Sequence, residues 1–120
     1  MYEEVSRGDS RPLVEALSDD VVWTIIGSTP LSGTYRGKKA VIEGLFGGLR
    51  EVLASPVVFS IERVIEEGEH AVLIATGATT AVTGRPYNNS YCIVARVVDG
   101  RFVELIDYVD TELVRALFDD

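Results

Sequence analysis

The sequence predicts a single α+β domain over residues 1–120, with helices packed on one face of a sheet. Two observations predict this fold class. Apolar residues recur at helical spacing through residues 38–53, which indicates a long amphipathic helix. From Pro56 onward the apolar period changes to two, as in strands, and turn sequences divide this part into segments of strand length.

The first part of the chain is expected to contain two helical segments followed by a strand. The helical segments are separated by a break at Gly8–Asp9, and Ser10 is expected to cap the second one, with Pro12 in its first turn. Residues 19–26, with the sequence DDVVWTII, form a short segment rich in β-branched and aromatic residues, so they are expected to form a strand.

A turn-rich loop at residues 27–37 follows, and it can hold a brief strand around Thr34–Tyr35. The long helix after it contains three glycines, each of which costs about 1 kcal/mol relative to alanine in a helix. Close packing against the sheet, or a local break in the helix, would explain why the chain tolerates Gly44, Gly47 and Gly48.

The second half of the chain predicts an antiparallel meander of four strands. Short turn sequences join the strands, and Asp99–Gly100 is a strong hairpin signal. The segment DTELVRALF is expected to form a terminal helix capped by Asp110 or Thr111. The four strands are expected at residues 57–66, 69–82, 87–98 and 101–110.

Composition argues against several classes of function. A formal charge of −8 without a basic patch argues against nucleic-acid binding. No apolar stretch approaches the ~18 residues that span a bilayer, and the single cysteine, Cys92, cannot form an internal disulfide, so a cytoplasmic protein is expected. No metal or cofactor is expected, because no set of histidine, cysteine and acidic residues has ligand spacing and no glycine-rich nucleotide motif occurs.

Side-chain alternation predicts that both faces of the sheet are largely apolar. In the last strand, Leu105, Asp107 and Val109 share one face, and Ile106 and Tyr108 share the other. An antiparallel sheet normally keeps one polar face in contact with water, and helices cover only one face. A second copy of the chain is the economical cover for the other face, which predicts a homodimer through the outer face of the sheet.

The two aspartates near the C-terminus have different explanations. Asp110 lies where the last strand becomes a helix, so N-capping accounts for it. Asp107 lies in the body of the strand, where burial of an unpaired carboxylate raises its pKa. Either Asn89 or Tyr91 satisfies Asp107, or Asp107 is a carboxyl group in a pocket that acts as a general acid or base.

Several motifs carry a family resemblance over nearly the whole chain: RGD (7–9), LSDDVVW (17–23), GSTPLSGTYRGKKAV (27–41), GRPYNNSY (84–91) and VVDGRFVELIDYVDT (97–111). In these motifs and in element order the chain resembles the SnoaL-like branch of the nuclear-transport-factor-like superfamily, which includes ketosteroid isomerases, limonene epoxide hydrolases and polyketide cyclases. The resemblance implies a cone-shaped α+β barrel, in which a strongly curved, mainly antiparallel sheet wraps around helices and leaves an apolar pocket. It also implies the residues that line this pocket: Trp23, Ile25, Ile74, Thr76, Ala78, Asn89, Tyr91, Ile93, Leu105 and Asp107.

The resemblance supplies one catalytic residue and omits its usual partners. Asp107, in the sequence DYVD, matches an acidic residue that limonene epoxide hydrolases have in the last strand. Their Arg-x-Asp pair falls near Ile74 and Thr76, and their Tyr-x-Asn pair falls near Trp23 and Ile25. The general base of ketosteroid isomerases falls between these two residues, at Thr24.

Two functions remain open at this point. One is a cofactor-free acid–base enzyme, such as an isomerase, a cyclase or an enzyme that adds water as epoxide hydrolases do. It would act on a hydrophobic polyketide-, terpenoid- or steroid-like compound through Asp107, with Asn89 and Tyr91 assisting. The other is a non-catalytic module for ligand binding or dimeric assembly, which the replacements at Thr24, Ile74 and Thr76 favour.

Overall fold

The structure is a computed structural model that describes residues 11–118. The predicted first helical segment, the break at Gly8–Asp9 and the cap at Ser10 lie outside the described residues. The described elements, in chain order, are α2 (Arg11–Ala16), β1 (Leu17–Ile25), β2 (Gly33–Arg36), α3 (Lys38–Ala40), η1 (Val41–Phe46), α4 (Gly47–Val52), β3 (Val58–Glu67), β4 (His70–Thr80), β5 (Pro86–Val98), β6 (Arg101–Val109) and α5 (Thr111–Ala116).

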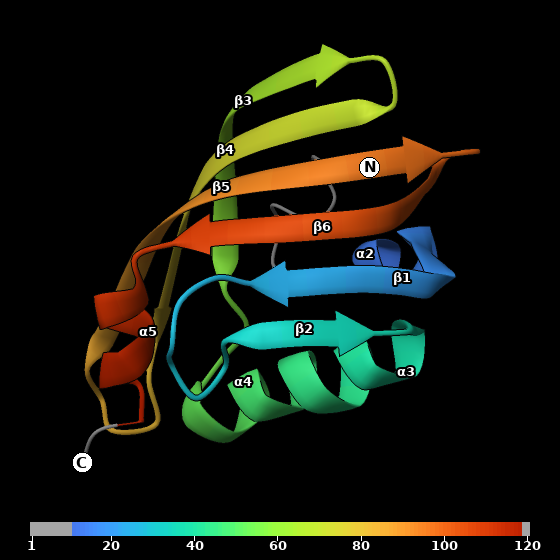
Figure 1. The fold of residues 1–120 in the computed structure, drawn as a ribbon. Coiled ribbons are helices and arrows are strands. Elements are labelled where there is room, and N and C mark those ends of the chain that lie inside the picture. Colours follow the sequence, from blue (N-terminus) through green and yellow to red (C-terminus); the bar gives the residue numbers. More distant parts are fainter. Residues whose placement is uncertain (1–10, 119–120) are drawn as a thin grey trace.

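One curved, open sheet of six strands forms the body of the molecule, in the order β2-β1-β6-β5-β4-β3 (Figure 1). The four strands from β3 to β6 pair antiparallel in chain order, which confirms the predicted meander. Asp99 and Gly100 join β5 to β6 with φ angles of 52° and 76°, as the hairpin signal predicts. The α+β cone expected from the resemblance is thus confirmed as a fold, although its sheet does not close into a barrel.

The parallel pairing of β1 with β6 was not part of the sequence prediction. It aligns Trp23 with Leu105 and Ile25 with Asp107. Residues that pair across neighbouring strands project to the same face, so this pairing places Trp23 and Asp107 on one face of the sheet.

The predicted long helix is present over residues 38–52, but its centre, η1, is π-helical. Both explanations offered for its glycines therefore apply. A Cβ atom on Gly44 would lie 3.1 Å from the Tyr35 ring, and one on Gly48 would lie 3.1 Å from Leu31. The helix approaches its neighbours closely at these two positions, and the widened turn lies between its two α-helical ends.

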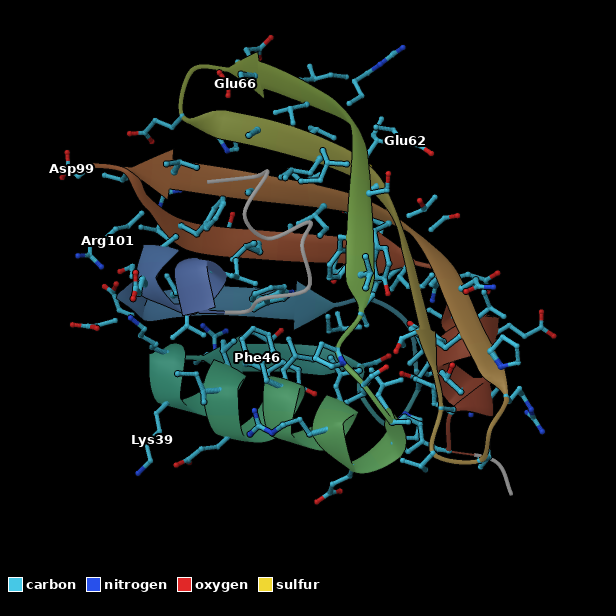
Figure 2. All side chains as sticks on the ribbon, turned by 180° about the vertical axis from the view of Figure 1, so that it is seen from behind. Lys39, Phe46, Glu62, Glu66, Asp99 and Arg101 are labelled. Atoms are coloured by element: carbon cyan, nitrogen blue, oxygen red, sulfur yellow. The ribbon has the colours of Figure 1, made fainter. Side chains whose placement is uncertain are left out.

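The core lies between this helix and the concave face of the sheet. Val41 and Leu45 of η1 pack into one buried cluster with Leu17, Val21 and Trp23 of β1. Figure 2 shows this side of the sheet, with Phe46 between the helix and the strands. The opposite, convex face has no described helix over it, and its apolar residues are half-exposed.

The terminal helix α5 begins as predicted. The Asp110 carboxylate accepts hydrogen bonds from the backbone N–H groups of Glu112 at 3.0 Å and Leu113 at 3.4 Å. Asp110 is thus the N-cap, of the two candidates at this junction. None of the described helices is both long enough and apolar enough to cross a membrane.

Candidate functional site

The candidate site centres on Asp107, which projects from β6 onto the concave face. Its neighbours across the two adjacent strands are Ile25 of β1 and Ile93 of β5, so the carboxyl group has apolar side chains on both flanks. Asp107 is 7% exposed, and its Oδ1 atom is buried without a hydrogen-bond partner among the described residues. Burial raises the pKa of Asp107 to about 7, because removal from water penalises the charged form.

Trp23 lies beside Asp107 on the same face. Its indole ring meets the Phe46 ring edge-on, with the ring centres 5.7 Å apart. The N–H group of Trp23 favours the charged form of Asp107 and so lowers the pKa of that carboxyl. The rise in pKa that burial causes is larger. Nevertheless, Trp23 Nε1 makes no hydrogen bond of ordinary geometry within the described part of the chain.

Tyr87, Asn89 and Tyr91 of β5 form a hydrogen-bonded group next to this pair. The Asn89 side-chain amide donates to the Tyr87 hydroxyl at 2.9 Å and to the Asp110 carbonyl at 3.2 Å. Its oxygen accepts from the backbone N–H groups of Ser90 at 2.8 Å and Asp110 at 3.1 Å. Both donors and both acceptor positions of the amide are therefore used, and Asn89 holds β5 to the β6–α5 junction.

The hydroxyl and the ring of Tyr91 also contact other residues of this region. Its hydroxyl donates to the Tyr87 hydroxyl across 3.4 Å, and its ring meets Phe59 edge-on at a centroid distance of 5.1 Å. Burial is the main cause that raises the pKa of both tyrosines, and the negative charge of Asp107 contributes to both shifts. Both hydroxyl groups therefore stay neutral near pH 7, close to the carboxyl.

The alternative that Asn89 or Tyr91 satisfies Asp107 is not what the structure shows. The side chains of both residues bond elsewhere, and no hydrogen bond joins either one to Asp107. Tyr87 is a member of this group that the sequence analysis missed. A usable signal was present, because Tyr87, Asn89 and Tyr91 alternate along one strand and so share a face.

The structure places most of the predicted pocket-lining residues on the concave face and corrects the rest. Their contact with a ligand remains a prediction. Three predicted members on β4 were assigned to the wrong face: Ile74 pairs with Cys92, Thr76 with Ser90 and Ala78 with Asn88, which all belong to the convex face. A shift of one residue along a strand reverses the face, and the concave positions of β4 are Leu73, Ala75 and Gly77. The residues that stay on the concave face are Trp23, Ile25, Asn89, Tyr91, Ile93, Leu105 and Asp107.

The same correction applies to Thr24. Its hydroxyl lies 3.2 Å from that of Thr34 on the exposed side of the β1–β2 pair. It therefore does not occupy the position of a general base on the concave face. The neighbours of Asp107 from β1 are Trp23 and Ile25, which bring one N–H group and no acid.

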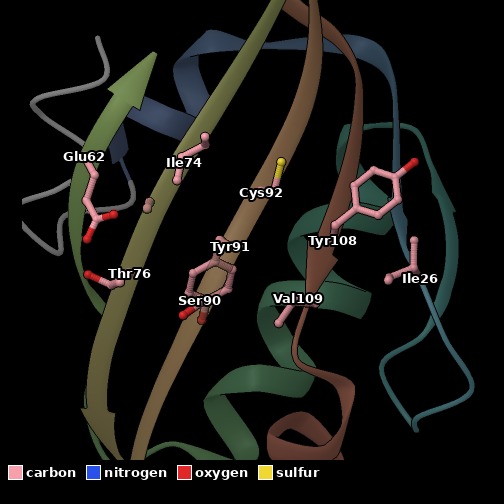
Figure 3. A pocket seen from close by; sticks show the side chains of 10 residues that line it. Ile26, Glu62, Ile74, Thr76, Ser90, Tyr91, Cys92, Tyr108 and Val109 are labelled. Atoms are coloured by element: carbon pink, nitrogen blue, oxygen red, sulfur yellow. The ribbon is translucent and has the colours of Figure 1, made fainter. Parts of the chain in front are cut away.

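The convex face carries a groove of about 490 Å³. Ile74 and Thr76 of β4 line it together with Ser90 and Cys92 of β5 and Tyr108 of β6 (Figure 3). Tyr91 also lines this groove, whereas Asp107 does not. Within residues 11–118, no group of three or more histidine, cysteine or acidic side chains could hold a metal ion.

Comparison with known proteins identifies the family. Residues 1–105 match the model of the SnoaL-like domain. A solved NTF2-like protein of unknown function from Burkholderia pseudomallei is 30% identical with a TM-score of 0.84, and the match covers 99% of this chain and 92% of that one.

Two other solved structures share the fold at lower identity. TerC, co-crystallised with polyporic acid, is 21% identical with a TM-score of 0.83, over 99% of this chain and 92% of that one. A protein from Bacillus subtilis, described as a candidate isomerase, is 22% identical with a TM-score of 0.76, over 92% and 81% of the two chains. The search of curated proteins gives no match. The chain therefore belongs to the SnoaL-like family of the NTF2-like superfamily.

Proposed function

We propose that this chain is a cofactor-free acid–base enzyme of the isomerase or cyclase type. In this proposal Asp107 transfers a proton to or from a hydrophobic small molecule bound against the concave face. The observation that carries the proposal is the Asp107 carboxyl, which is buried among apolar side chains and has an Oδ1 atom without a partner in the described chain.

The protonation behaviour of Asp107 suits this role. A general acid or base works best when its pKa lies near the working pH, because both of its forms are then populated. Burial raises the pKa of Asp107 to about 7. This is the arrangement by which enzymes obtain acid–base chemistry from a carboxyl group at neutral pH.

The surroundings of Asp107 favour an uncharged, apolar substrate. Asp107 is the one charged group among the buried side chains of the described residues, so an anionic ligand would meet repulsion without a counter-charge. The rings of Trp23, Phe46 and Tyr91 and the flanking isoleucines offer apolar contact. A polyketide-, terpenoid- or steroid-like compound has this character, and the description of one fold neighbour as a candidate isomerase supports the proposed class of reaction.

Ligand binding at Asp107 requires a local rearrangement of the structure. Because Asp107 is only 7% exposed, a ligand can contact it only after a covering side chain moves.

The test is catalysed hydrogen exchange at carbon, which detects proton transfer without knowledge of the natural substrate. A steroid enone, carvone and 1-tetralone are each incubated with the protein in D₂O at pD 7, and deuterium uptake is followed by mass spectrometry. We expect exchange into at least one ketone to be faster with the wild type than with Asp107→Asn by about 100-fold or more. Asp99→Asn, which neutralises an aspartate in the exposed hairpin, is the matched control and is expected to keep the wild-type rate.

Equal exchange rates for the wild type and Asp107→Asn would reject Asp107 as the proton carrier. A non-catalytic binding module is then the candidate that remains. One observation favours this candidate. The Asn89 side chain makes all of its hydrogen bonds to other groups, so it does not assist Asp107 in catalysis. Native mass spectrometry distinguishes the two functions, because a binder retains its ligand unchanged and an enzyme alters it.

We also propose that the protein forms a homodimer through its convex face. Val72, Ile74, Val94 and Ile106 project from this face and are half-exposed, and Tyr108 is 45% exposed. A contiguous apolar surface of this kind marks an interaction site in soluble proteins. A two-fold arrangement lets the same surface cover itself.

A further inference from the structure

Two buried polar atoms on the concave face lack hydrogen-bond partners among residues 11–118, and they belong to neighbouring side chains. They are Nε1 of Trp23 and Oδ1 of Asp107, in side chains that are 6% and 7% exposed. A buried polar atom without a partner typically costs about 1–3 kcal/mol, and most such atoms in native proteins are satisfied. Two of them in contacting positions therefore require a common explanation.

The sheet positions the two atoms side by side. In the parallel pairing of β1 with β6, Trp23 aligns with Leu105 and Ile25 with Asp107, so Trp23 and Asp107 are diagonal neighbours on one face. Phe46 fixes the indole ring from the helix side through its edge-on contact. Asn89 is fully hydrogen-bonded to other groups, so it does not compete for either atom.

We propose that Trp23 Nε1–H and the Asp107 carboxyl together hold one oxygen atom of the ligand. This inference rests on the proposed function, and it assigns Trp23 a role as a hydrogen-bond donor in addition to any stacking of its ring. Trp23 becomes the residue that determines which polar group the site accepts.

The chemistry of the two groups restricts that polar group. An indole N–H only donates, so the ligand atom beside it must accept a hydrogen bond. A hydroxyl oxygen can accept from Trp23 and donate to an ionised Asp107, and a carbonyl oxygen can accept from Trp23 and from a protonated Asp107. An ammonium group only donates, so it could pair with an ionised Asp107 but could not accept from the N–H of Trp23. A carboxylate or phosphate would meet Asp107 with no buried cation nearby among the described residues.

The single tryptophan of the chain allows a direct test. Its indole N–H group gives one resonance in a ¹H–¹⁵N spectrum, and this resonance is followed while 2-naphthol, naphthalene or 2-naphthylmethylammonium is added at pH 7. We expect 2-naphthol to bind about five- to tenfold more tightly than naphthalene, and to move the indole proton downfield. We expect the ammonium probe, which has no acceptor for the indole N–H, not to move the indole proton downfield.

Two changes at position 23 separate the N–H group from the ring. Trp23→Phe, and replacement of the indole by benzothiophene, both remove the donor, and the second keeps the shape of the side chain if the first does not fold. Each is expected to lower the affinity for 2-naphthol to that for naphthalene, while the affinity for naphthalene stays within about twofold of wild type.

The outcomes distinguish this inference from the proposed function. Equal affinity for 2-naphthol and naphthalene, or the same preference for 2-naphthol after removal of the N–H, would overturn the two-point contact and leave the site in place. An indole resonance that follows the ionisation of Asp107 and ignores every bound probe would show that Trp23 serves only the carboxyl group. Failure of all three probes to bind would count against both the contact and a ligand site on the concave face.

Discussion

Asp107 and Asp110 lie three residues apart and have different environments. The Asp110 carboxylate bonds two backbone N–H groups and caps α5, as its position before a helical segment predicted. Asp107 projects into the core with apolar neighbours on both adjacent strands. The alternation of side chains in the last strand was enough to separate them, because only Asp107 lay in the body of the strand.

The buried state of Asp107 predicts how stability depends on pH. Its pKa is about 7 in the folded protein, against an ordinary value of 3.8. Between these values the folded state holds a proton that the unfolded state has lost, so the free energy of unfolding falls as pH rises from about 4 to about 7 and then levels. At about 1.4 kcal/mol per pKa unit, this contribution is roughly 4 kcal/mol.

Asp107→Asn removes this contribution, since an amide does not ionise. Urea unfolding of both proteins between pH 4 and pH 8 is expected to show that the variant gains stability relative to wild type as pH rises, until it is the more stable protein at pH 8. Tyr87 and Tyr91 stay neutral across this range, because burial raises the pKa of each. Asp99→Asn is expected to keep the wild-type pH dependence, and a constant difference between wild type and Asp107→Asn would show that Asp107 is not buried as described.

Among the helices and strands, some glycines lie where neighbouring segments approach each other closely. A Cβ atom on Gly77 of β4 would lie 2.6 Å from Val57 and 2.8 Å from the Tyr91 ring. Gly77 thus provides the space in which Tyr91 packs, between β4 and Phe59. A Cβ atom on Gly47 at the start of α4 would meet its nearest atom, the Ile42 carbonyl oxygen, at 3.7 Å, which is an ordinary contact.

These two glycines therefore predict opposite effects of the same substitution. Gly47→Ala is expected to stabilise the protein by up to about 1 kcal/mol, because alanine favours the helix and meets no clash. Gly77→Ala is expected to destabilise it by about 1–3 kcal/mol, because the Tyr91 ring or Val57 must shift. Both changes are measured by urea unfolding, and destabilisation by Gly47→Ala would show that the helix needs a glycine at that position.

The sequence pattern predicted which helices and strands form. It predicted the contacts between them less well. The meander, the hairpin at Asp99–Gly100 and the close approach at Gly44 follow from local period and turn chemistry, so they could be predicted. The parallel pairing of β1 with β6 joins segments far apart in the chain, and no local signal specifies it. The contact of Trp23 with Asp107 depends on that pairing, which is why the sequence identified both residues but not their relation.

The errors on β4 have a related cause. The resemblance located the strand correctly, but it did not fix the alignment to one residue. Because side chains alternate, an uncertainty of one residue decides between the two faces. Ile74 and Thr76 therefore belong to the groove on the convex face instead of the site around Asp107.

For the whole molecule, the sheet has two largely apolar faces and the described helices cover only the concave one. This is the basis of the proposed homodimer, and it predicts that a charge introduced on the convex face weakens association without unfolding the chain. Ile74→Glu places a carboxylate in the groove beside Cys92 and Tyr108, where a second copy would bury it.

The measurement is sedimentation equilibrium of the wild type, Ile74→Glu and Val82→Glu over a range of protein and salt concentrations. We expect the wild type to be a dimer and Ile74→Glu to raise the dissociation constant by about 100-fold or more, since burial of an unpaired charge costs several kcal/mol. Val82 is 58% exposed in the turn that joins β4 to β5, away from the groove, so Val82→Glu is the matched control and is expected to stay dimeric. Each subunit carries a charge of −8, so added salt is expected to strengthen the dimer by screening repulsion between the copies. A wild type that remains monomeric at all concentrations, or an equal effect of both substitutions, would rule out the convex face as the dimer interface.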